Sequence, residues 1–195
     1  RMEGLERIYD AEFFKEWGRS NALYVACARQ VGRALLEDLQ PRRLVDFGSG
    51  CGVYADFFRS RGVEVLALDG VACPPNDSFE GHVEIRDFTV PFPNMWGEFD
   101  LAVCLEVAEH IPEPDCETFL DNLLQFAPVV ALSAAPPNQG GTHHVNERPK
   151  RYWQALLAAR GFKYDRPCTG LLVERFKREK LPYMWMGVQI SIYRR

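Results

Sequence analysis

The sequence lacks several features that would assign it to a class directly. No apolar run approaches the roughly 18 to 20 residues that cross a bilayer, and no charged start followed by an apolar stretch resembles a secretory signal. The six cysteines form no C-x-x-C pair, so neither a zinc ribbon nor a disulfide framework is predicted. We therefore expect a cytoplasmic protein with reduced thiols, and neither a membrane protein nor a secreted precursor.

Basic residues are scarce in the first three quarters of the chain, and acidic residues are scarce in the last quarter. Residues 1–146 contain 11 Lys and Arg against 23 Asp and Glu, a balance of −12, whereas residues 147–195 contain 12 against 4, a balance of +8. A basic end can meet nucleic acid or another acidic partner. The interpretation favoured here is a solvated face near a sheet edge, where Lys and Arg discourage aggregation.

Short apolar segments alternate with helical patterns. The apolar segments have strand length and are rich in Val, Leu and Ile, at 42–47, 63–69, 82–88, 99–106 and 128–134. The helical patterns lie at 11–18, 22–39, 52–62, 116–127 and 150–160. Strands that are apolar throughout are typical of a parallel sheet covered on both faces, so the order predicts a doubly wound α/β fold. We expect one domain over 1–195, with a helical cover (1–40), a core (41–165), and a C-terminal helix and last strand (166–195). The last strand is expected in 183–195, a segment that ends in β-branched alternation.

A glycine-rich loop directly follows the first predicted strand. Its glycines are Gly48, Gly50 and Gly52, and the position where a dinucleotide fingerprint requires its third glycine is Val53. Alternating glycines allow a tight turn and the close approach of a flat, bulky ligand. The next two strands end in Asp69, where a carboxylate can accept hydrogen bonds from a ribose diol, and in Asp87-Phe88, which are placed to hold an adenine.

These motifs together resemble the class I S-adenosylmethionine-dependent methyltransferases over roughly residues 40 to 165, on the sequences "LVDFGSGCG", "ALD", "RDF" and "FDLAVCLEVAEHIP". The resemblance implies a Rossmann-like seven-stranded sheet of order 3-2-1-4-5-7-6 with an antiparallel seventh strand, and S-adenosylmethionine as cofactor. The three glycines would pass beneath the methionine and ribose, and Asp69 would bind the ribose. The other implied cofactor contacts are Asp46 near the ammonium group, Asp87 and Phe88 at the adenine, and Glu106.

Aromatic residues crowd the N-terminal segment, at Tyr9, Phe13, Phe14 and Trp17. A sulfonium is a cation and is favoured beside ring faces. In many members of the family this segment covers the cofactor, so Tyr9 is a candidate cofactor neighbour and Phe14 a candidate substrate contact. The alternative is that the rings simply pack on the sheet.

The acceptor side is predicted from histidines, of which the chain has only four. His82 is expected on the surface, whereas His110, His143 and His144 follow the carboxyl ends of strands, where ligands bind in such sheets. The loop "GGTHHVN" resembles a G-G-x-H-H-x-N loop of small-molecule methyltransferases. His143 or His144 is the expected general base, His110 is a third candidate, and Asn146 is expected to orient the acceptor.

The segment Glu106-x-x-Glu109-His110 permits a second interpretation. With one later histidine such as His144, it resembles the metal-binding set of small-RNA terminal 2′-O-methyltransferases and of some quinone-biosynthesis O-methyltransferases. Two carboxylates and two imidazoles can hold Mg²⁺, Mn²⁺ or Zn²⁺. The same pattern also occurs in metal-free relatives, and the interpretation favoured here uses no metal.

The sequence thus predicts an enzyme that transfers a methyl group to a small molecule, most typically at a hydroxyl of a sugar or natural product. One alternative is a metal-dependent RNA 2′-O-methyltransferase, which is disfavoured because no separate RNA-binding module is evident. The other alternative is a methyltransferase-fold binding subunit without activity. Nothing in the sequence identifies the acceptor or the oligomeric state.

Overall fold

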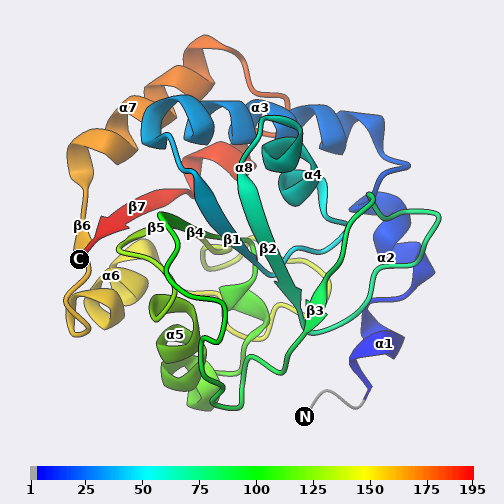
Figure 1. The fold of residues 1–195 in the computed structure, drawn as a ribbon, viewed down its shortest axis with the longest axis horizontal. Helices are drawn as coiled ribbons and strands as arrows, with labels where there is room; N and C mark the ends of the chain where they lie inside the picture. Colours follow the sequence, from blue (N-terminus) through cyan, green and yellow to red (C-terminus); the bar gives the residue numbers. More distant parts are fainter. Residues whose placement is uncertain (1–3) are drawn as a thin grey trace.

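A computed structural model describes residues 4–195, which form a seven-stranded sheet between two layers of helices (Figure 1). The strand order is β3-β2-β1-β4-β5-β7-β6. The strands are β1 Arg43–Phe47, β2 Glu64–Asp69, β3 Glu84–Ile85, β4 Leu101–Leu105, β5 Val129–Ser133, β6 Lys163–Tyr164 and β7 Ser191–Arg194. β1 to β5 pair in parallel, and β7 is antiparallel to both β5 and β6. The predicted doubly wound fold, its strand order and its antiparallel last strand are confirmed.

The helices divide between the two faces of the sheet because each buries one apolar stripe. In Figure 1, α3, α4, α7 and α8 lie on one face, and α5 and α6 on the other. The helices are α1 Leu5–Ile8, α2 Ala11–Glu16, α3 Ala22–Leu39, α4 Val53–Ser60, α5 Cys116–Leu124, α6 Lys150–Ala158, α7 Arg166–Arg178 and α8 Met184–Val188. Two short 3₁₀ helices, η1 Ala108–His110 and η2 Glu113–Asp115, follow β4. The central strands β1 and β4 are buried on both faces, as their continuous apolar sequence requires.

Two predicted strands differ from the structure. The third strand was expected over 82–88, but β3 has only two residues because Asp87 accepts hydrogen bonds from the backbone N–H and the hydroxyl of Thr89, which turns the chain. The tail was expected to be a strand from 183, but residues Met184–Val188 form α8. Met186 on this helix is buried, and α8 packs so closely on α7 that a Cβ at Gly187 would lie 2.6 Å from the Phe176 ring.

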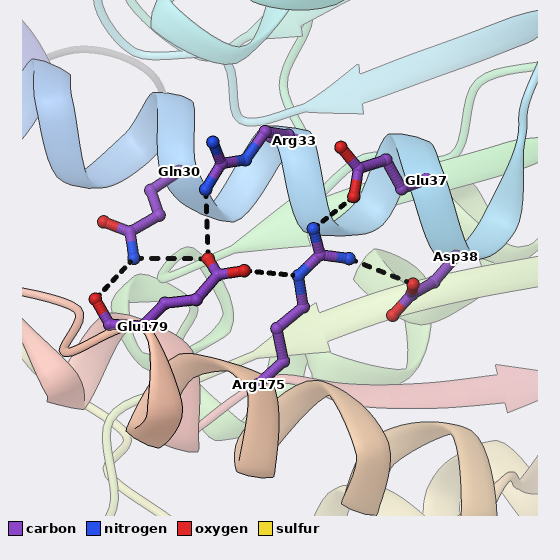
Figure 2. A network of polar contacts seen from close by, with 6 residues as sticks. All are labelled: Gln30, Arg33, Glu37, Asp38, Arg175 and Glu179. Carbon is purple, nitrogen blue, oxygen red and sulfur yellow. Dashed lines mark hydrogen bonds and ion pairs between the residues drawn. The ribbon is translucent and has the colours of Figure 1, made fainter.

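Much of the positive charge of the C-terminal part is neutralised within the fold. Figure 2 shows Arg175 of α7 reaching across to α3, where it pairs with Glu37 and, at 3.2 Å, with Asp38. Arg175 also contacts Glu179 at 3.0 Å, and Glu179 in turn pairs with Arg33 at 3.1 Å. The network joins the first and last long helices, so these charges serve the fold. The last strand lies between β5 and β6, and the antiparallel pair of β6 and β7 forms one edge of the sheet, as expected.

The described cysteines are all unpaired, in agreement with the expected reduced thiols. Within residues 4–195, no helix has both the length and the apolar character needed to cross a bilayer.

Candidate active site

Two neighbouring cavities, here called lobes, lie at the carboxyl ends of the parallel strands. The loop lobe, of about 540 Å³, is bordered by the loop after β5 from Gln139 to Thr142 and by His144. The strand lobe, of about 460 Å³, is bordered by the ends of β2 and β3 at Asp69 and Asp87. Both lobes share the lining residues Phe13, Phe14, Gly48, Gly50, Glu106 and His110. Cavities of this size suit ligands of small-molecule dimensions.

The glycine loop between β1 and α4 forms the floor of both lobes. Gly48 and Gly50 have φ values of 92° and 55°, which side-chain-bearing residues rarely adopt. A Cβ at Gly48 would lie 2.3 Å from Val107, whereas a Cβ at Gly50 would meet no atom within 4 Å and would project into open space. The loop therefore leaves room for a ligand to approach the backbone closely. Gly52 lies at the start of α4 and lines neither lobe.

Asp69 at the end of β2 is tied to the glycine loop. One carboxylate oxygen accepts the Gly50 N–H at 2.7 Å, and the other accepts the Val71 N–H at 3.1 Å. A carboxylate offers about four lone-pair sites, so acceptor capacity remains for a ligand. Asp87 lines the same lobe, and Phe88 beside it is stacked on Phe47 at a centroid distance of 4.0 Å. The structure thus brings the predicted diol-binding and ring-binding residues into one lobe.

Two buried acids face the loop lobe without a cationic partner. Asp46, which is 3% exposed, has one carboxylate oxygen with no hydrogen-bond partner, and both oxygens of Glu106 also lack one. Burial raises the pKa of Asp46 to about 7, and burial likewise raises the pKa of Glu106 to about 7. Groups of this kind are stabilised in their charged form by an arriving cation. Glu106 also adopts a φ of 57°, a conformation that costs energy and is often found at functional sites.

Glu109, His110 and His144 form a compact cluster next to these acids. One potential ligand atom from each residue lies within 4.8 Å of the others. Glu109 is fully buried, neither of its carboxylate oxygens has a hydrogen-bond partner, and burial raises its pKa well above the usual range. Burial lowers the pKa of His110 to about 4, so its imidazole is neutral at neutral pH. Of the four residues in the alternative metal set, the structure therefore joins three within this distance, and Glu106 is not among them.

Hydrogen bonds at Nδ1 favour one tautomer of each imidazole, the one with its lone pair on Nε2. Nδ1 of His110 lies 3.1 Å from the carbonyl oxygen of His143, which can only accept, and this contact favours a proton on Nδ1 and a lone pair on Nε2. Nδ1 of His144 lies 2.9 Å from the Glu147 carboxylate, which favours the same tautomer. The two rings meet edge to face with centroids 4.9 Å apart. Imidazoles held in this way are suited to accept a proton or to bind a cation.

Glu147 lines neither lobe but supports the site through His144, and the sequence analysis missed it. Besides His144, its carboxylate accepts the backbone N–H groups of Asn138 at 2.8 Å and Gly140 at 2.6 Å. It therefore holds the loop after β5 in shape as well as orienting the histidine. The spacing His144-x-x-Glu147 is the only signal in the sequence, and a pair three residues apart outside a helix does not predict contact.

Residues 19–166 match the family model described as "Methyltransferase domain". This chain belongs to that family.

The methyltransferase resembles curated and solved proteins at low identity. The ubiquinone biosynthesis O-methyltransferase of Bordetella avium is 26% identical over 136 residues, which cover 64% of this chain and 52% of that protein. The chain therefore spans about half the length of the curated relatives it matches. Structural neighbours include 1,6-didemethyltoxoflavin-N1-methyltransferase from Burkholderia thailandensis, solved with S-adenosylhomocysteine (TM-score 0.62, 17% identity, 100% of this chain and 90% of that one). Another is the small RNA methyltransferase HEN1 (TM-score 0.59, 16% identity, 86% of this chain and 25% of that one).

The family assignment confirms the predicted class, the class I S-adenosylmethionine-dependent methyltransferases, and with it the cofactor of that class. The cavity fits this cofactor in three ways: open space above Gly50, acceptor capacity on Asp69, and unpartnered carboxylates at Asp46 and Glu106 for an ammonium group. The carboxylate of Glu109 with the imidazoles of His110 and His144 also fits a divalent cation, because hard oxygen and imidazole donors are its common ligands.

The N-terminal helices of the methyltransferase contribute walls to the cavity. Tyr9 lines the strand lobe, and its hydroxyl lies 3.0 Å from Nδ1 of His110. Phe13 and Phe14 line both lobes, so the rings that the sequence analysis singled out do face the cavity. Asn146, in contrast, lines neither lobe. It is 4% exposed, and its amide contacts Cys116 and Arg148, so its expected role toward the acceptor stays a prediction.

The predicted histidines are divided between the lobes. His144 lines the loop lobe, His143 lines the strand lobe, and His110 lines both. His82 is exposed and contacts Glu84 at 3.0 Å, as expected for a surface residue.

Proposed function

We propose that this protein transfers a methyl group from S-adenosylmethionine to an oxygen of a small molecule held in the loop lobe. The observation that supports this best is that the two lobes share part of their lining: diol-binding and ring-binding groups line one, and two imidazoles whose Nδ1 atoms are already hydrogen-bonded line the other. An oxygen acceptor is further supported by the curated relatives, which are named O-methyltransferases.

Cofactor binding is assigned to the strand lobe and to the acids beside it. Asp69 would accept the ribose hydroxyls, and Phe88 would pack near the adenine, with Asp87 beside it. Asp46 and Glu106 would pair with the ammonium group of the methionine part. When bound, S-adenosylmethionine supplies an electrophilic methyl group on a sulfonium. The task of the chain is then to align that methyl group with the acceptor oxygen.

His144 is proposed as the general base. Its Nδ1–H donates to Glu147, which leaves Nε2 to take the acceptor's hydroxyl proton, and the carboxylate stabilises the imidazolium that forms. His110 is the second candidate, but Nδ1 of its ring faces a carbonyl rather than a carboxylate, and its lowered pKa makes it the weaker base. His143 faces the strand lobe, which makes it the least suited of the three.

A second mode of action is favoured by the Glu109 cluster. Glu109, His110 and His144 would hold a divalent cation, which would lower the pKa of an acceptor hydroxyl. The unpartnered, fully buried Glu109 carboxylate is the specific observation behind this mode, because a buried acid without a partner is costly. An RNA acceptor is not favoured, since among residues 4–195 no Lys or Arg borders either lobe to contact phosphates.

The two modes are separated by cation binding, measured without any acceptor. Calorimetric titration with Mn²⁺ should show a site in the parent protein, lost in Glu109→Gln and retained in Glu113→Gln, a control glutamate that pairs with Arg148 away from the cluster. Absence of binding by the parent protein would contradict the cation mode and leave His144 as base.

Methyl transfer itself is tested with methyl-labelled S-adenosylmethionine and a panel of hydroxylated small molecules. The expected result is a labelled methyl ether whose formation depends on His144. Binding of the cofactor without labelling of any acceptor would instead support a non-catalytic binding subunit.

A further inference from the structure

The cavity is lined by acidic side chains of many elements. Its carboxylates come from α2, from the ends of the strands and from both 3₁₀ helices, namely Glu16, Asp46, Asp69, Asp87, Glu106, Glu109 and Asp115. Among the described residues, neither lobe is lined by a lysine or an arginine. Arg148, which follows the loop after β5, is turned away to Glu113 at 2.9 Å and contacts Asn146.

We infer that the acceptor is an aromatic alcohol that is either uncharged or cationic, and that the site rejects acceptors bearing a carboxylate or phosphate. This inference rests on the proposed function and specifies the substrate class of the same site. It goes beyond the fold and the family, neither of which determines the charge of the acceptor.

The acids of the loop lobe are not neutralised by partners within the protein. Both oxygens of Glu109 and one oxygen of Asp46 are buried and lack hydrogen bonds. An anionic acceptor would lie close to these carboxylates in a setting of reduced dielectric constant, where their ionised forms would repel it strongly. Bound cofactor has a net charge of about +1, and together with a divalent cation it would still leave a surplus of carboxylates. The site is therefore expected to disfavour an anionic acceptor in either mode of action.

Aromatic walls make the same lobe suitable for a ring and tolerant of a cation. Trp17, Tyr24 and Trp185 line it, and the Trp17 ring meets the other two edge to face at centroid distances of 5.6 and 5.7 Å. Apolar ring faces pack well on an aromatic acceptor, and their negative faces attract an ammonium group.

Glu16 allows the charge of the lobe to be changed without altering the cofactor site. It is the last residue of α2, is exposed, and lines only the loop lobe. Glu12 lies on the same helix, lines neither lobe and pairs with Lys15, so it is a matched control.

The experiment measures binding of three probes with the same ring and hydroxyls to protein saturated with S-adenosylhomocysteine. The probes are 4-methylcatechol (neutral), dopamine (cationic) and 3,4-dihydroxybenzoate (anionic). We expect the anionic probe to bind about tenfold or more weakly than the neutral one, the size given by one uncompensated unit charge roughly 7 Å away at an effective dielectric constant of about 40. Dopamine should bind at least as tightly as 4-methylcatechol. Glu16→Lys should reduce the preference severalfold, and Glu12→Lys should leave it unchanged.

Equal or tighter binding of the anionic probe would overturn the inference, as would binding of none of the three. An equal loss of preference in both lysine variants would also overturn it, because the charge would then act through the general surface. Binding of S-adenosylhomocysteine, recorded in the same samples, tests the proposed function separately: without it the function fails, whereas with it only the acceptor class is at issue.

Discussion

Removal of the Glu147 side chain should disturb the loop after β5 and the tautomer of His144 together. Glu147 accepts three hydrogen bonds, from Nδ1 of His144 at 2.9 Å and from the N–H groups of Asn138 at 2.8 Å and Gly140 at 2.6 Å. Hydrogen bonds to a charged group contribute about 1.5 to 3 kcal/mol each when buried. Because the Glu147 side chain is 17% exposed and water can replace part of each bond, we expect Glu147→Ala to lower the free energy of unfolding by only ~1–2 kcal/mol in total.

The assay for stability is thermal unfolding, where this loss corresponds to about 2–8 °C in a chain of this size. If Glu147 had a structural role alone, this loss of stability would be the only effect of the substitution. The positioning role also predicts that His144 changes from the Nδ1–H form to a mixture of tautomers, which nitrogen chemical shifts of the imidazole report directly. Methyl transfer should fall by about 10- to 100-fold, with the affinity for S-adenosylmethionine nearly unchanged.

Glu113→Ala is the matched control, because this glutamate also contacts a basic residue, Arg148, but lies outside the cluster. It should leave the tautomer of His144 and the rate as in the parent protein. The reasoning would be refuted if Glu147→Ala retained both the tautomer and the parental rate, since His144 would then be oriented by other contacts.

Three further predictions follow from the site. Gly48→Ala should destabilise the protein by ~1–3 kcal/mol, because φ is 92° there and the new Cβ would meet Val107 at 2.3 Å; chemical denaturation measures this, and parental stability would contradict it. His144→Ala should lower kcat by about 10²–10⁴-fold with little effect on cofactor affinity, whereas His143→Ala should reduce kcat far less; the reverse order in steady-state kinetics would assign the base to His143. Because burial raises the pKa of Asp46 from 3.8 to about 7, its contribution to stability is present below pH 4 and declines as the pH rises to 7; Asp46→Asn should flatten that part of the stability profile, and an unchanged profile would show that the acid is solvated.

The part of the fold that the sequence predicted is the part encoded locally. The strand ending at Phe47 is apolar throughout and is followed by glycines at positions that require positive φ, so strand, turn and helix start are all visible in neighbouring residues. The strand order came from the family resemblance rather than from the pattern. α8 was misread as a strand because its helix is favoured by packing of Met186 and Gly187 on α7, which the local sequence does not reveal.

The residues of the site likewise divide into those that the local sequence predicts and those whose positions depend on distant contacts. Asp69 and Phe88 follow strands whose ends must meet at one edge of the sheet, so their proximity could be predicted. Glu147 and Asn146 could not be assigned in this way, because both lie in one irregular segment whose course depends on contacts with the loop and with Cys116. From the sequence the amide was the more attractive candidate, but it is the Glu147 carboxylate that contacts a lobe-lining residue, His144.

The most direct test of the central claim is calorimetric titration of the parent protein and of Asp69→Ala with S-adenosylmethionine. The account predicts one binding site in the parent protein and an affinity weaker by about 2 to 3 kcal/mol in the variant, because the ribose hydroxyls lose a charged acceptor. Since Asp69 also accepts the Gly50 and Val71 N–H groups, unfolding of the variant is measured alongside to show that it is folded at the titration temperature. Absence of binding by the parent protein, or equal affinity in the folded variant, would contradict the account.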